Sequence, residues 1–146
     1  MDKMQAYGAL FGRVLLGSVF IITGMVRLSQ WSPSVDYLAG MGIPLVPVLL
    51  AMALLLQFLA ALCVLTGFMA RAGAIVLALL TIPATVIFHS YWTYPAGVEQ
   101  QTQALLFLKN IAIFGGLIVV ASLGPGPIAL TIGKPKTTTT AQSQPA

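Results

Sequence analysis

The sequence predicts an all-α integral membrane protein: a four-helix bundle with both termini in the cytoplasm and a short extramembrane helix between spans 1 and 2. Two observations lead to this class. Only 7% of the 146 residues are charged and 58% are hydrophobic, whereas charged residues make up about 25% of a soluble domain. The charges also leave four uncharged stretches for spanning helices, which need roughly 20 apolar residues each: 14–26, 37–70, 72–98 and 110–133.

The first predicted span, 7–28, reaches full length only if it includes Arg13, about four turns before Arg27. A cleavable signal peptide is the alternative for this segment, because Lys3 precedes an apolar run. No A-x-A cleavage site follows, however, and the run ends in Met25-Val26-Arg27. We therefore expect the first span to remain as a membrane helix.

Proline and glycine mark the next elements. Ser32-Pro33 is typical of a helix start and Gly42 of a helix end, which predicts a short helix over 33–41. Pro44 begins the second span, 44–68. Only two residues separate that span from Arg71, so the third span, 71–91, follows through a tight hairpin and lies antiparallel to the second.

Turn signals also bound the fourth span. Tyr94-Pro95-Ala96-Gly97 predicts a turn before a span over 104–123, and Gly124-Pro125-Gly126 closes it. The polar, Thr- and Pro-rich residues 131–146 are predicted to be a disordered cytoplasmic tail. Residues 1–6 form a cytoplasmic N-terminus, and 7–130 a single transmembrane domain.

The distribution of charge predicts the orientation of the chain in the membrane. Lysine and arginine in short loops favour the cytoplasmic side. With both termini inside, the outer loops hold Asp36 and Glu99, and the inner side holds Lys3, Arg71, Lys134 and Lys136. The net charge of +4 then indicates topology and contact with anionic lipid rather than nucleic-acid binding.

Helical spacing places the polar residues of each span on a face with small residues. In the first span this face holds Arg13, Gly17, Phe20, Gly24 and Arg27. In the third it holds Arg71, Ile75, Ala78, Ile82, Thr85 and His89. In the fourth, Lys109, Ala112 and Gly116 align beside Asn110, Phe114 and Leu117. Membrane helices associate largely through small-residue faces, so we expect these faces to meet in a polar seam.

The polar residues of this seam are expected at different depths in the membrane. Its bundle-stabilising members are Arg13, Gln57 and Arg71, with both arginines toward the cytoplasm and Gln57 near the middle of its span. Because successive spans alternate in direction, Arg27, His89, Lys109 and Asn110 all lie toward the outer side. Pro83 inside the third span is expected to kink the helix and open space below His89. A charge inside hydrocarbon costs about 2.5–3.5 kcal/mol on insertion scales, so these residues predict a shared polar pocket.

Structural roles are the alternative for each of these residues. Lys109 and Arg27 lie near a span end, where they could snorkel to the interface or pair with Asp36 or Glu99. His89 could belong to an interfacial aromatic belt with Tyr91 and Trp92. For Gln57 we expect a hydrogen bond to another helix.

Several chemistries find no support in the sequence. One histidine, one cysteine and three acidic residues offer no metal cluster. Cys63 has no second thiol for a disulfide relay within the chain. The sequence contains no glycine-rich phosphate loop and no nucleophile motif.

Five segments in a fixed order carry a family resemblance: Arg13…Gly24…Arg27, Gly40-Met41-Gly42-Ile43-Pro44, Gly67-Phe68-Met69-Ala70-Arg71, His89-Ser90-Tyr91-Trp92, and Lys109-Asn110 with Gly124-Pro125-Gly126. From about residue 13 to residue 130, the chain resembles the DoxX family of small four-helix bacterial membrane proteins. The resemblance implies that the chain lies in a bacterial cytoplasmic (inner) membrane. Similar members often carry a glutamate at the position of Gln57 and an aspartate at that of Thr131. The glutamine argues against a proton relay through position 57.

The resemblance implies an association with redox enzymes, since some relatives are subunits of quinone-reducing membrane complexes. We expect an accessory subunit, at most part of a quinone-linked oxidoreductase and without a redox centre of its own. Its candidate cofactor is a quinone near the outer leaflet, with Arg27, His89, Lys109 and Asn110 as hydrogen-bond donors and Trp92 and Phe114 as ring surfaces. Electrons would come from a partner redox protein; a homo-oligomer is the other expected assembly. The alternatives are a non-catalytic scaffold for a partner enzyme and, third, a small transporter.

Overall fold

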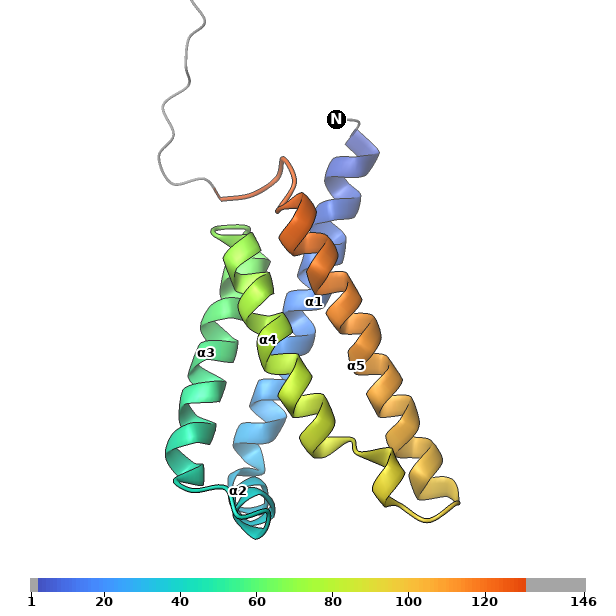
Figure 1. Cartoon of the computed structure of the whole chain (residues 1–146). Helices are drawn as coiled ribbons and strands as arrows, with labels where there is room; N and C mark the ends of the chain where they lie inside the picture. Colours follow the sequence, from blue (N-terminus) through green and yellow to red (C-terminus); the bar gives the residue numbers. More distant parts are fainter. Residues whose placement is uncertain (1–2, 131–146) are drawn as a thin grey trace, which may run out of the picture.

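The computed structural model describes residues 3–130 and is helical throughout that range apart from its turns and loops (Figure 1). Four long helices are apolar and long enough to cross a membrane: α1 (Lys3–Ser29), α3 (Val46–Thr66), α4 (Ala70–Phe88) and α5 (Val98–Leu123). The short helix α2 (Trp31–Gly40) joins α1 to α3, and the 3₁₀ turn η1 (Tyr91–Thr93) lies between α4 and α5. The predicted four-helix membrane bundle is confirmed. Thr131 and the predicted tail, 131–146, lie outside the described residues.

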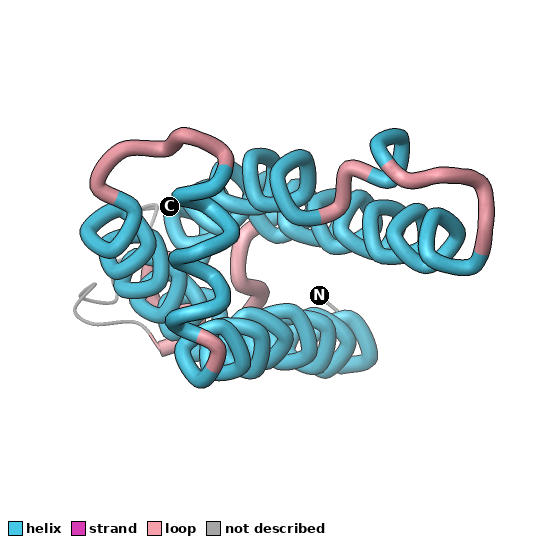
Figure 2. Tube along the Cα trace, turned by 90° about the horizontal axis from the view of Figure 1, so that it is seen from below, coloured by secondary structure: helices cyan, strands magenta, loops and turns pink. Residues whose placement is uncertain are grey.

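The long helices pack in the order α1, α3, α4, α5 (Figures 1 and 2). Helix α3 packs on both α1 and α4, and α4 also packs on α5, whereas α1 and α5 make few contacts with each other. These two helices approach near the end that holds the α3–α4 hairpin, and they diverge toward the end that holds α2 (Figure 1). Following the charge distribution, we call the hairpin end the inner end and the α2 end the outer end.

Glycines allow the helices to approach closely. A Cβ at Gly17 would lie 2.5 Å from Cγ of Leu65, and one at Gly73 would lie 2.7 Å from the carbonyl oxygen of Ala60. The buried residues of α1 are Arg13, Gly17, Phe20 and Gly24, all of which were predicted for the inward face of the first span. Arg27, the fifth residue predicted for this face, is half-buried. Large apolar side chains remain exposed on the outside of every long helix. In a bilayer these side chains contact lipid.

The inward face predicted for the third span is partly wrong. Ala78 and Thr85 are buried, but Ile75 and Ile82 are about half exposed. The buried face of α4 is rotated from the prediction and consists of Ala70, Gly73, Ala74, Leu77, Ala78, Thr81 and Thr85. Arg71 is exposed in the first turn, and His89 caps the helix end. Neither polar end residue therefore marks the packed face.

The predicted limits of α4 and α5 also differ from those observed. Helix α4 ends at Phe88, and its cap residue His89 donates its backbone N–H to the Thr85 carbonyl. Helix α5 begins at Val98, six residues before the predicted start at 104, with Glu99 in its first turn. A negative charge there interacts favourably with the helix dipole. The earlier start adds almost two turns of α5 at the outer end.

The segment after α5 crosses the inner end of the bundle (Figure 1). Gly124, with a φ of 87°, ends the helix, as the Gly-Pro-Gly motif predicted. Arg13, only 2% exposed, donates to the carbonyls of Pro125 and Ile128 through its two terminal nitrogens. The backbone N–H of Leu130 then bonds the Thr66 carbonyl at the end of α3, 3.0 Å away. Arg13 thus fastens the segment 124–130 to the first span.

Candidate functional site

A cavity of about 540 Å³ lies in the outer half of the bundle, where α1 and α5 diverge. All four long helices contribute to its wall, and Leu38 and Ile43 close it from α2 and the loop that follows. Most of the lining is apolar. Its polar residues are Thr23, Arg27, Gln57, Thr81, His89, Lys109 and Asn110. Pro83 also lies in the wall, on the side where the sequence predicted open space.

The inner end of the cavity is fixed by Gln57. Its Nε2 donates to the Phe20 carbonyl of α1 at 2.8 Å, so the expected bond to another helix forms. Nε2 also lies 3.4 Å from Oγ1 of Thr23. Gly24 makes room for this contact, because a Cβ there would lie 3.1 Å from Nε2 and 2.8 Å from the Phe58 ring. Gln57 is therefore first a link between α3 and α1.

We expect the substitution Gln57→Leu to lower the free energy of unfolding by only about 0.6 kcal/mol, the average for an interhelical hydrogen bond in a membrane protein. Reversible unfolding in mild detergent measures this change. Thr102→Val is the control, because the Thr102 hydroxyl bonds a carbonyl of its own helix, that of Val98. A loss above about 2 kcal/mol would contradict a purely local role for this bond.

Arg27 enters the cavity from α1 and stacks on an aromatic ring. Its Cζ lies 3.8 Å from the centroid of the Phe88 ring, a cation–π contact. Tyr37 of α2 stacks on the same ring at 5.6 Å and donates its hydroxyl to the Ile87 carbonyl. Within residues 3–130, neither Asp36 nor Glu99 forms an ion pair. The ion pairs considered for Arg27 and Lys109 are therefore absent from the described residues.

Lys109 and Asn110 lie on the opposite wall, on α5. Neither side chain has a hydrogen-bond or ion-pair partner among the described residues. Lys109 is exposed and Asn110 half-buried. No acidic residue is among the described residues that line this cavity. The described lining thus presents two cations and the amides of Asn110 and Gln57, with no carboxylate beside them.

His89 reaches the cavity from the end of α4, and its partner was not predicted. Its Nδ1 lies 2.9 Å from Oε1 of Gln103 on α5. Gln103 is two helical turns before Asn110 and so shares its face. This spacing could have identified it, but the predicted span began at 104. The true start of α5 brings Gln103 into the helix.

The two aromatic residues proposed as ring surfaces lie elsewhere. Trp92 is not part of the cavity wall; it packs edge-on against Tyr91 and Phe107, which connects η1 to α5. Phe114 packs against the central apolar core. The aromatic surfaces that do line the cavity are Phe20 and Phe88. The structure therefore brings together Arg27, His89, Lys109, Asn110 and Gln57 but not Trp92.

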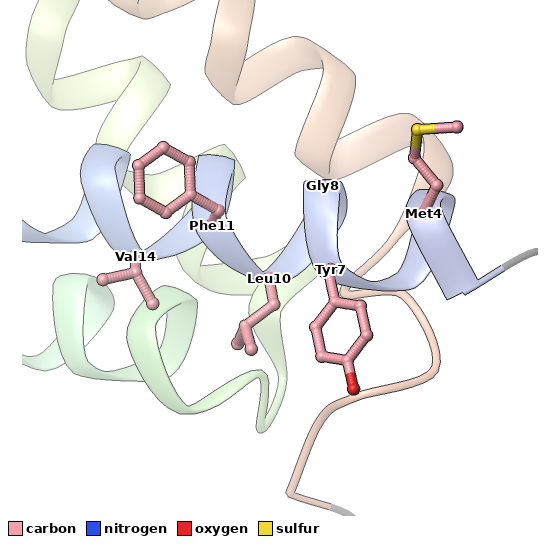
Figure 3. A pocket seen from close by; sticks show the side chains of 6 residues that line it. All are labelled: Met4, Tyr7, Gly8, Leu10, Phe11 and Val14. Carbon is pink, nitrogen blue, oxygen red and sulfur yellow. The ribbon is translucent and has the colours of Figure 1, made fainter.

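A second surface depression lies along the inner half of α1 (Figure 3). All of its lining residues come from this single helix: Met4, Tyr7, Gly8, Leu10, Phe11 and Val14. Figure 3 shows the side chains of Tyr7, Leu10 and Val14 on one side of the helix and those of Met4 and Phe11 on the other. A Cβ at Gly8 or Gly12 would meet nothing within 4 Å. This is a lipid-facing helix surface without converging polar groups.

Comparison with known proteins identifies the family. A sequence model of the DoxX family matches residues 8–90. Inner membrane protein YqjF of Escherichia coli is 32% identical over 130 residues, which are 89% of this chain and 94% of that protein. Inner membrane protein YphA of the same organism is 30% identical over 121 residues, 83% of this chain and 86% of that protein.

A more distant relative is the Surfeit locus protein 4 homolog of Drosophila melanogaster, 24% identical over 136 residues, or 92% of this chain but 44% of that protein. No solved structure matches the chain at a significant level. The residues matched by the family model end before Lys109 and the Gly-Pro-Gly motif, whereas the E. coli relatives align with most of the chain. The chain is thus a multi-pass inner-membrane protein that belongs to the DoxX family.

Proposed function

We propose that this protein is a redox-associated accessory subunit that binds a quinone-like ligand in the outer cavity. The observation that carries the proposal is the pairing of apolar walls with unpartnered hydrogen-bonding groups, Lys109 and Asn110. Ligand sites are typically mostly apolar with a few placed polar groups, and volumes of about 300–1,000 Å³ are common for them. The cavity volume of about 540 Å³ falls within that range.

The lining suits a flat ring with an apolar tail. Phe20 and Phe88 offer ring surfaces, and the ammonium of Lys109 and the amide of Asn110 can donate to a ring carbonyl. The position between the diverging ends of α1 and α5 supports entry from the lipid, where quinones dissolve. Arg13 and Arg71 donate to backbone carbonyls at the inner end and support only the packing of the bundle.

The site holds a ligand but offers no redox chemistry of its own. Its side chains bind and orient a ring, and the single cysteine, Cys63, lies on α3 outside the cavity lining. A partner redox protein would therefore exchange electrons with the bound ring. Because this chain would bind the ring and a partner would exchange the electrons, we propose that the chain is an accessory subunit.

We expect protein purified in mild detergent from its native membranes to carry a quinone or its quinol, which extraction and mass spectrometry will detect. Lys109→Leu should reduce the bound quinone about tenfold or more, because a donor to the ring is lost. Lys3→Leu is the matched control, since Lys3 lies at the exposed start of α1. The same preparation tests the scaffold alternative. A co-purified enzyme with neither quinone nor quinol in wild type or Lys3→Leu would overturn the ligand-binding role.

A further inference from the structure

The bond between His89 and Gln103 fixes the position of a proton. Nδ1 of His89 faces Oε1 of Gln103 at 2.9 Å, and an amide oxygen can only accept a hydrogen bond. A hydrogen bond between these two atoms therefore requires the hydrogen on Nδ1. In the neutral ring the other nitrogen, Nε2, then carries a lone pair and acts as an acceptor. Nε2 has no hydrogen-bond partner among residues 3–130.

His89 borders a cavity whose charged groups are cations. His89 lines the cavity whereas Gln103 does not. The charged groups that line it are Arg27 from α1 and Lys109 from α5. Helix α3 contributes the neutral Gln57, and no residue of α4 in the lining is titratable. A dicarbonyl ring offers only acceptors, so it leaves the Nε2 lone pair unmatched. A ring hydroxyl can donate to Nε2, and its oxygen gains favourable interactions with the cations as negative charge develops on it.

We infer that the cavity selects the reduced, hydroxyl-bearing form of its ligand, a quinol, and that Gln103 is the positioning residue that makes His89 the acceptor. This inference rests on the proposed function. The ligand hydroxyl donates to Nε2; when its proton transfers, the O–H bond breaks, an N–H bond forms on Nε2, and no electron moves. Lys109 and Arg27 stabilise the resulting phenolate, and Nδ1–H of the imidazolium keeps its bond to Gln103.

The sequence contains a single histidine, so ¹⁵N-histidine labelling reports on His89 alone in protein purified without a histidine tag. In detergent or nanodiscs, the ligand-free protein should show a protonated Nδ1 and an unprotonated Nε2. Three probes are then compared without oxygen: an alkylated hydroquinone, its quinone and its dimethyl ether. The hydroquinone should bind about tenfold more tightly than either other probe, since only it can donate. It alone should shift the Nε2 resonance.

Variants of Gln103 separate positioning from general stability. Gln103→Leu should remove the tautomer preference of His89 and bring the affinities for hydroquinone and quinone to within about twofold of each other. Gln103→Glu keeps an acceptor for Nδ1–H and should restore the preference. Gln101→Leu is the matched control, because Gln101 is an exposed glutamine on the same helix.

Two results would overturn the inference while leaving the proposed function in place: a ligand-free His89 protonated on Nε2, or a quinone that binds as tightly as its hydroquinone. If none of the three probes binds the wild-type protein, the proposed function and this inference fail together. The comparison of wild-type affinities decides between these cases even if a Gln103 variant fails to fold.

Discussion

Replacing Gly73 by alanine is expected to lower the free energy of unfolding by about 1–3 kcal/mol, the usual cost of overpacking. A Cβ at this position would lie 2.7 Å from the Ala60 carbonyl oxygen and 2.8 Å from Cβ of Cys63. Neither atom ends a flexible side chain, so α3 and α4 must separate to make room. The loss should appear even though alanine favours a helix over glycine by about 1 kcal/mol.

Gly115→Ala supplies the matched control for this prediction. Gly115 is also inside a membrane helix, but a Cβ there would meet nothing within 4 Å, so only the gain in helix propensity applies. Thermal unfolding in mild detergent can be followed by the labelling rate of Cys63, the single cysteine. Equal stability of the two alanine variants would show that α3 and α4 do not approach as closely as described.

The number and order of the helices could be predicted because hydrocarbon demands long apolar runs and excludes charge. The inward face of α1 could also be predicted, since Arg13 and the glycines at 17 and 24 interrupt an otherwise bulky apolar surface. The face of α4 could not be predicted in this way. Arg71 and His89 lie at and beyond its ends, and isoleucines serve equally well against lipid or a neighbouring helix. A periodicity that included the end residues Arg71 and His89 therefore predicted the wrong buried face for α4.

The depth of the polar residues in the membrane was easier to predict than their side-chain contacts. Alternating helix directions place Arg27, Lys109 and Asn110 at the outer level, and the structure brings all three to the cavity wall. The partner of His89 depended on where α5 begins, because Gln103 belongs to the turns that precede the predicted start. The position of the Trp92 ring depended on the turn η1, which places this ring against Phe107. The contacts of side chains near helix ends depend on the geometry of the adjoining loops, and the spacing of residues in the sequence does not reveal that geometry.

Replacing Arg13 by methionine is expected to release the segment 124–130 and to lower the free energy of unfolding by about 2 kcal/mol. Arg13 donates to the carbonyls of Pro125 and Ile128, and hydrogen bonds to charged groups each contribute about 1.5–3 kcal/mol. Part of this loss is offset, because methionine removes a buried charge. Hydrogen exchange should accelerate at the amide of Leu130, which bonds Thr66 across the end of α3.

The guanidinium fork, rather than positive charge alone, should account for this anchoring. Arg13→Lys keeps the charge but replaces the planar fork with a single ammonium, so it should recover only part of the protection at Leu130. Arg71→Met is the matched control, because exposed Arg71 makes one longer contact, 3.4 Å to the Leu123 carbonyl. Exchange at Leu130 that stays slow in Arg13→Met would mean that the Thr66 carbonyl holds the segment without Arg13. In that case Arg13 would act only in the packing of α1.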